Sequence, residues 1–144
     1  MMLLITIGIT FAMGLSFFLL YTRMKKWCTN KFRWRITGIF LIVGLIGLIG
    51  SFIFDMKTEK GLRILFSSMI VPFIYNSVDR FFKQMSEKYQ KRDFLLYLRF
   101  SPDIDKLSEI GASNPHIKRL DAFFSITLLI FIVLIMFIPM IVFI

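Results

Sequence analysis

Residues 122–144 read AFFSITLLIFIVLIMFIPMIVFI, a run that contains no charged side chain. An α-helix needs about 20 predominantly apolar residues to cross the hydrocarbon core of a bilayer, and such a length without charge is hard to explain in water. Two further runs share this property, residues 3–22 (LLITIGITFAMGLSFFLLYT) and residues 36–54 (ITGIFLIVGLIGLIGSFIF). The sequence therefore predicts a small integral membrane protein.

A fourth apolar run, residues 62–78 (LRILFSSMIVPFIYNSV), is shorter and carries Arg63, Pro72 and Asn76. The composition fits a chain that lies largely in lipid, because 57% of its 144 residues are hydrophobic and 18 of them are Phe. With the fourth run counted as a span, we predict an all-α, polytopic fold with four transmembrane helices.

These spans divide the chain into consecutive parts. Residues 1–78 hold the first three helices, with a basic loop at residues 23–35 between the first and second. Residues 79–121 form a short, helical, cytoplasmic segment, and residues 122–144 form the fourth helix. The segment is too small to fold as an independent enzyme domain.

The positive charges orient the chain in the membrane. The loop at residues 23–35 holds six Lys and Arg and no acid, and residues 79–121 hold nine Lys and Arg. Because positively charged loops stay in the cytoplasm, both segments are expected inside and both termini outside. The two basic segments share a side only if residues 62–78 span the membrane. Abundant Lys, Ile and Phe with few Ala suggest a bacterial inner membrane.

Aromatic residues alternate with the cations of the first loop. Trp27, Phe32 and Trp34 stand among Lys and Arg, a pattern that could serve nucleic-acid binding by base stacking. The position beside two spans favours the other interpretation, in which aromatic residues anchor the helices at the interface and the cations attract anionic lipid. We therefore expect a lipid partner and no nucleic acid.

Small residues recur at helical spacing on the first two spans, where they allow helix backbones to approach closely. They are Gly8, Ala12 and Ser16 on the first span, and Gly44, Gly47 and Ser51 on the second. Two interpretations remain open. The first two spans could pack on each other as a hairpin, or the small residues could form the interface or pore lining of a homo-oligomer.

Polar residues gather along one side of the third span. Ser68, Asn76 and Asp79 lie along this side together with Pro72, and Tyr75 lies beside them. Polar groups at membrane depth usually face the interior of a helix bundle and can mark a pathway. This stripe is our candidate site, either as a polar path or as a hydrogen-bonded seam between helices.

The segment after the third span has an amphipathic pattern that predicts one helix from Val78 to Phe100, continuous with that span. Its interaction face comprises Phe81, Phe82, Met85, Tyr89 and Leu96. This face is expected to pack on the membrane surface, on a neighbouring subunit or on another protein. Further helix signals follow at Ser101-Pro102, Gly111 and Asn114-Pro115.

Motifs for catalysis or metal binding are missing from the sequence. His116 is the only histidine and Cys28 the only cysteine, and no nucleotide-binding glycine motif or G-x-S-x-G motif occurs. His116 and Asp121 match the H-x-x-x-x-D pattern of membrane glycerolipid acyltransferases. On a helix, however, two residues five apart point about 140° from each other. We expect no enzymatic activity, no metal and no cofactor.

Two functional hypotheses follow from these patterns. In the first, the protein self-assembles in the membrane as a homo-oligomer with a pore or channel, gated through its cytoplasmic helices. In the second, it is a non-catalytic membrane subunit or scaffold that holds a partner protein through residues 78–121.

Overall fold

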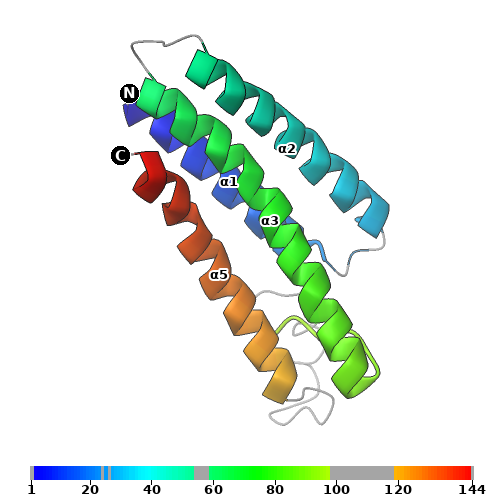
Figure 1. The fold of residues 1–144 in the computed structure, drawn as a ribbon. Coiled ribbons are helices and arrows are strands. Elements are labelled where there is room, and N and C mark those ends of the chain that lie inside the picture. The colour runs from blue at the N-terminus through cyan, green and yellow to red at the C-terminus, as the bar shows by residue number, and fades with distance from the viewer. Residues whose placement is uncertain (1, 24, 26, 54–58, 98–118, 144) are drawn as a thin grey trace. The chain divides into compact units, whose positions relative to one another are not determined.

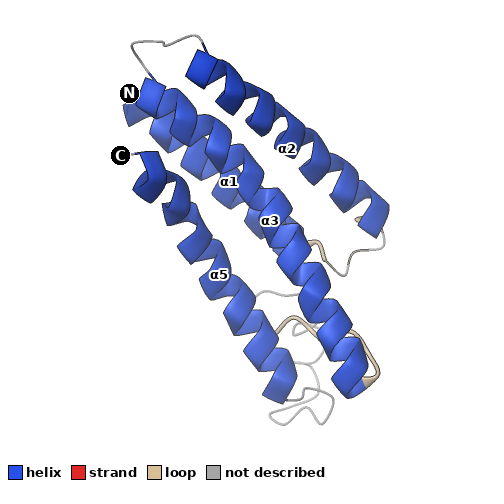
Figure 2. Ribbon diagram, viewed as in Figure 1, coloured by secondary structure: helices blue, strands red, loops and turns tan. Residues whose placement is uncertain are grey.

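The structure is a computed structural model that describes residues 2–23, 25, 27–53, 59–97 and 119–143. Its four helices are α1 (Met2–Tyr21), α2 (Asn30–Ile53), α3 (Glu59–Gln90) and α5 (Arg119–Phe143) (Figure 1). In the part of the chain that the structure describes, helices are the only regular secondary structure (Figure 2). All four are long and apolar enough to cross a membrane. The predicted all-α fold with four candidate spans is confirmed.

Helix α2 begins six residues earlier than the apolar run that predicted it. Thr29 caps its first turn, since the Thr29 hydroxyl oxygen accepts a hydrogen bond from the backbone N–H of Phe32 at 3.3 Å. The backbone N–H of Arg33 bonds to the carbonyl of Thr29 at 3.0 Å. Part of the predicted loop at residues 23–35 is therefore the first turns of a helix.

Helix α3 has 32 residues and is about 48 Å long at 1.5 Å per residue, against a hydrocarbon core of about 30 Å. The helix predicted to continue to Phe100 ends at Gln90. Lys91 takes a left-handed conformation with φ of 57°, and the described residues that follow it, up to Tyr97, are not helical. The later helix signals and His116 lie among residues 98–118, outside the described residues.

The chain divides into two compact units. The first unit comprises residues 1–76 and 132–144, and the second unit comprises residues 77–131. In the first unit, α1 and the first part of α3 run in one direction, while α2 and the last part of α5 run in the other (Figure 1). The start of α1 and the end of α5 consequently lie at the same end of this unit.

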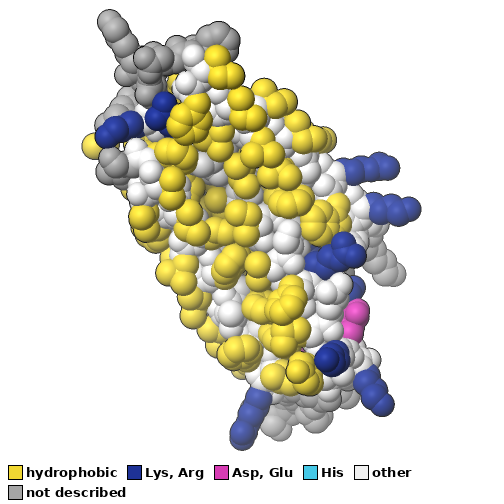
Figure 3. All heavy atoms as spheres, viewed as in Figure 1, with side chains coloured by type: hydrophobic (Ala, Val, Ile, Leu, Met, Phe, Trp, Pro, Cys, Tyr) yellow, Lys and Arg dark blue, Asp and Glu magenta, His cyan; other side chains and the backbone are white. Residues whose placement is uncertain are grey.

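The outer surfaces of the helices are apolar. Figure 3 shows hydrophobic side chains over their sides, with Lys and Arg side chains near their ends. Large apolar side chains are exposed on α2, including Ile46 and Ile53, and on α5, including Leu134 and Ile141. Such surfaces are stable in contact with lipid, whereas a soluble monomer rarely exposes apolar patches of this extent.

Aromatic contacts join the helices at both ends of the first unit. The Arg63 guanidinium lies 4.2 Å from the centre of the Phe52 ring, and Phe52 lies 6.5 Å from Phe143. These contacts connect α2, α3 and α5. At the other end, the rings of Trp34 in α2 and Phe73 in α3 meet edge to face at 5.4 Å.

Candidate functional site

The buried face of α3 is polar along most of its length. Its members, each at most 9% exposed, are Ser68, Tyr75, Asn76, Asp79, Ser86 and Gln90. We call this row the polar seam. Pro72 lies on the same face and is buried as well. All five residues of the predicted stripe are therefore buried. Buried polar groups are expected on a membrane helix whose apolar side faces lipid.

In the first unit, α1 approaches the seam closely at Gly8. A Cβ atom added to Gly8 would lie 2.9 Å from the Leu65 Cα and 3.4 Å from the Ser68 Oγ. The Ser68 hydroxyl donates a hydrogen bond to the carbonyl of Ile64 at 2.7 Å, within its own helix. This part of the seam is thus a tight contact between two helices.

In the first unit, the Ser16 Oγ and the Asn76 Nδ2 are buried and make no hydrogen bond to a described residue. Because α1 and α3 run in the same direction and Gly8 contacts Ser68, a step of eight residues along each helix brings Ser16 level with Asn76. An unpaired buried polar group costs about 1–3 kcal/mol. This level of the bundle therefore carries two polar groups whose burial no hydrogen bond to a described residue offsets.

The small residues of α2 also face α3. A Cβ on Gly44 would lie 2.7 Å from the Phe66 carbonyl oxygen, and one on Gly47 would clash with the Phe66 ring. Ala12, Ser16 and Ser51 are buried as well. At Gly8, Gly44 and Gly47 the close approach is therefore to α3, a partner that neither the hairpin nor the oligomer interpretation named. Phe11 and Phe40 connect α1 with α2 instead, at 4.8 Å between ring centres.

In the second unit, residues 91–97 turn back from the end of α3 and lie along α5. We call this segment the strap. The Arg92 guanidinium donates to the Asp121 carboxylate at 2.6 Å, and the backbone N–H of Leu95 donates to the other carboxylate oxygen at 3.2 Å. One turn further along α5, the Ser125 hydroxyl accepts a hydrogen bond from the backbone N–H of Tyr97 at 2.9 Å. Asp121 and Ser125, four residues apart on one face of α5, thus bind alternate amides of the strap.

The strap is also held from α3. The Ser86 hydroxyl donates to the Arg92 carbonyl at 3.0 Å, and Lys83 pairs with Asp93 at 3.5 Å. These bonds explain why α3 ends at Gln90, since the chain beyond it exchanges helical bonds for contacts with α5. The Gln90 side chain is buried, and neither of its amide atoms has a partner among the described residues.

Aromatic side chains form the core beneath the strap. The Phe124 ring of α5 lies 5.2 Å from Phe82 of α3 and 5.5 Å from Phe94 of the strap. Phe94 and Leu96 are almost completely buried, as their alternation along an extended segment allows. Each half of the strap therefore has both polar and apolar contacts.

The structure divides the predicted interaction face. Phe82 and Leu96 belong to the core of the second unit, and Met85 is half-buried. Phe81 and Tyr89 remain 56% and 65% exposed. Phe81, Met85 and Tyr89 follow one another at four-residue spacing, so they form one row, which we call the α3 stripe.

Arg92, Asp121 and Ser125 were not predicted as site residues. A signal for two of them was present in the sequence, because Asp121 and Ser125 stand four residues apart at the start of an otherwise apolar helix. Two polar residues on one face of a lipid-embedded helix indicate a buried polar partner. The partner itself, a backbone segment at residues 95–97, left no comparable pattern.

Within the described ranges, no group of three or more His, Cys, Asp or Glu side chains could hold a metal ion. Both Asp121 oxygens are engaged by the strap, so the geometry supports a role in holding structure. No known protein family, curated protein or solved structure matches the chain.

Proposed function

We propose that this protein is a non-catalytic membrane anchor that holds a partner protein at the cytoplasmic face through the α3 stripe. The observation that carries the proposal is the exposure of Phe81 and Tyr89 on the last turns of α3. Apolar side chains at this spacing suit a contact with a helix or groove of another protein.

The length of α3 supports this role. From Arg80 to Gln90 the helix adds about 15 Å to the part that precedes it, beyond the apolar run that ends at Val78. These turns are not required to cross the hydrocarbon core. The strap packs on a face of these turns that differs from the α3 stripe. The stripe thus lies on a stiff helix, whose end is joined to α5 through the strap and the bonds of Arg92, Asp121 and Ser125.

The charge around the stripe indicates the chemistry of the partner. Exposed cations surround it, namely Arg80, Lys83, Lys88 and Lys91. Glu87 is the exposed acid on these turns, and it pairs with Lys83 at 3.8 Å. A partner with an acidic rim around an apolar surface would complement this arrangement. The same cations favour the cytoplasmic side for this end of α3.

Charge substitution tests the proposal. Phe81→Glu and Tyr89→Glu are expected to remove a protein that copurifies with the wild-type chain from membranes, measured by quantitative mass spectrometry. Gln84→Glu is the matched control, because Gln84 is exposed on the same turns but lies off the stripe. Equal retention of the partner by Phe81→Glu, Tyr89→Glu and the control would contradict the proposal.

A homo-oligomeric pore is the second candidate function. The unpaired Ser16 Oγ and Asn76 Nδ2 favour it, because such atoms are expected beside a path that admits water. Against it stands the use of the small-residue faces within one chain. Purified protein in liposomes would pass ions or dye, and Asn76→Leu or Ser68→Leu would change the flux. Bilayers that stay tight under every condition would exclude the pore.

A further inference from the structure

The last part of α5 packs against its neighbours in the first unit differently from α1 and α2. The α1–α3 and α2–α3 contacts leave no space for a methyl group at Gly8 or Gly44. Beside α5, by contrast, two hollows remain, of about 190 Å³ against α1 and about 220 Å³ against α3. Protein interiors are normally close-packed, so these hollows mark places where the helices do not fill the space between them.

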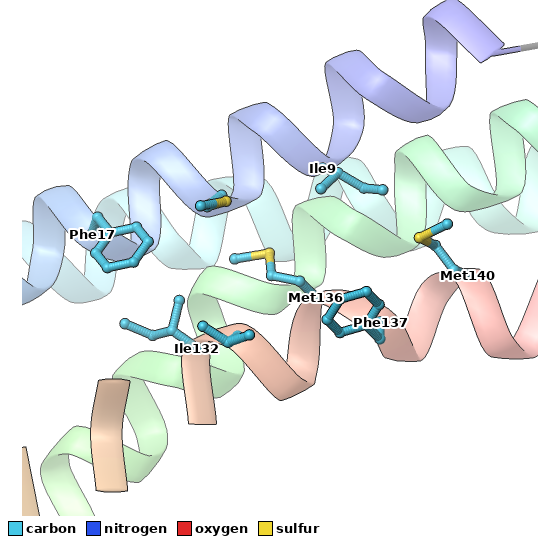
Figure 4. Close-up of a pocket in the computed structure, with 8 residues that line it drawn as sticks. Ile9, Phe17, Ile132, Met136, Phe137 and Met140 are labelled. Carbon is cyan, nitrogen blue, oxygen red and sulfur yellow. The ribbon is translucent and has the colours of Figure 1, made fainter. Parts of the chain in front are cut away.

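The hollow between α1 and α5 is apolar on every side. Figure 4 shows side chains of α1, among them Ile9 and Phe17, directed at the same space as Met136 and Phe137 of α5. All eight lining residues are Ile, Met, Phe or Val. Water would find no hydrogen-bond partner here, because an apolar cavity without polar lining stays dry.

The hollow is also open at the surface of the helices. Met13 and Val133, which line it from opposite helices, are both exposed by more than 40%. Since both positions lie in the middle of candidate spans, the opening faces hydrocarbon. An apolar cavity of about 150 Å³ accommodates a molecule the size of benzene, so this one has space for roughly six or more carbon atoms.

We propose that the α1–α5 hollow is a binding site for one acyl chain of a membrane phospholipid. Its chemistry fits a saturated or monounsaturated hydrocarbon chain, which brings no polar group to the site. Three of the eight lining residues are Met, whose flexible thioether side chains adapt to ligands of variable shape. A bound chain fills the space that α5 leaves open and fixes α5 on α1. This inference is independent of the α3 stripe and of any protein partner.

Photolabelling tests the site directly. The purified protein is reconstituted in nanodiscs of phosphatidylethanolamine and phosphatidylglycerol that contain a phospholipid with a diazirine on one acyl chain. After irradiation, mass spectrometry identifies the labelled peptides and residues. We expect labels to concentrate on residues that line the hollow, above all Met13 and Val133, at least about threefold over the exposed Leu134. Equal labelling of Leu134 and the hollow would mean general lipid contact only and would overturn the proposal.

A pair of neighbouring substitutions provides the control. Val133→Trp places a large ring at the mouth of the hollow, whereas Leu134→Trp adds a ring on the adjacent exposed surface of the same helix, which lines neither hollow. Labelling at Met13 is expected to fall at least about threefold in Val133→Trp and to stay unchanged in Leu134→Trp.

A substitution on α1 that also fills the hollow serves as the test if Val133→Trp does not fold. Met13→Trp fills the hollow from α1 and is expected to lower labelling at Val133 to the same extent. Unchanged labelling in every folded blocking variant would contradict the site. A Met13→photo-methionine variant tests whether a second copy of the chain fills the hollow instead. If it does, the same irradiation gives protein–protein adducts, and this result would also overturn the proposal of an acyl-chain site.

Discussion

The Arg92 guanidinium and the Asp121 carboxylate form an ion pair at 2.6 Å that joins the strap to α5, with the Asp121 side chain completely buried and that of Arg92 32% exposed. Removal of one member of a buried pair is costly because it leaves the other charge unpaired. We expect Asp121→Ala to lower the free energy of unfolding by about 3 kcal/mol and Asp121→Asn by less, because Asn keeps an acceptor for the Leu95 amide. Denaturant unfolding in mild detergent measures both changes.

A double-mutant cycle measures the interaction between Arg92 and Asp121. Arg92→Ala alone leaves a buried carboxylate, while Arg92→Ala with Asp121→Asn leaves a neutral amide. The double variant is expected to be more stable than the sum of the single effects predicts, by roughly 1–2 kcal/mol. Additive effects would show that the two side chains do not interact.

The left-handed backbone conformation of Lys91 allows a further prediction about stability. A residue with a Cβ atom pays about 1 kcal/mol in this region, and glycine does not. Lys91→Gly is therefore expected to raise the midpoint of thermal unfolding. Lys88→Gly, within the last turn of α3, should lower it, because glycine costs about 1 kcal/mol relative to alanine inside a helix. A lower midpoint for Lys91→Gly would contradict the observed end of α3.

The glycines of α2 permit a matched test of the close helix contacts. A methyl group at Gly44 would meet the Phe66 carbonyl oxygen, which belongs to the backbone and cannot rotate away. Gly44→Ala is expected to destabilise the protein by about 1–3 kcal/mol. A methyl group at Gly50 meets nothing within 4 Å, so Gly50→Ala should be neutral or stabilising by up to about 1 kcal/mol. Equal effects at both positions would show that α2 does not pack on α3 through Gly44.

Asn76 is expected to reduce stability in the native chain. Its unpaired Nδ2 lies in the interior of the first unit, so Asn76→Leu should raise the free energy of unfolding by about 1–2 kcal/mol. Phe81→Leu, at an exposed position, is expected to leave it almost unchanged. A strong loss of stability in Asn76→Leu would show that the amide has a partner, such as bound water, that the leucine displaces.

The sequence predicted the parts of this fold that depend on local composition. The charge-free runs at residues 3–22, 36–54 and 122–144 predict three spans because lipid accepts few other segments. The fourth span depended on an argument from charge placement, and α3 fulfils it by length and composition. The start of α2 at Asn30 was not predicted, although Thr29 is a favourable N-cap residue.

Tertiary contacts determined what the sequence did not predict. The apolar periodicity of residues 78–100 indicated one helix, but the Asp121 and Ser125 side chains bind the strap as an extended segment. The helical pattern therefore placed Leu96 on the predicted interaction face, whereas the structure buries it in the core of the second unit. Similarly, small-residue spacing predicted close packing on α1 and α2 without naming α3 as the common partner.

Photo-crosslinking from the α3 stripe tests whether this stripe holds a partner protein. Benzoyl-phenylalanine at position 81 or 89 is irradiated in intact membranes, with Ile126 on the exposed face of α5 as the lipid-facing control. We expect an adduct with one defined second protein from positions 81 and 89 and none from position 126. An adduct of twice 17.0 kDa, meaning a second copy of the chain, or the lack of any protein adduct at positions 81 and 89, would contradict it.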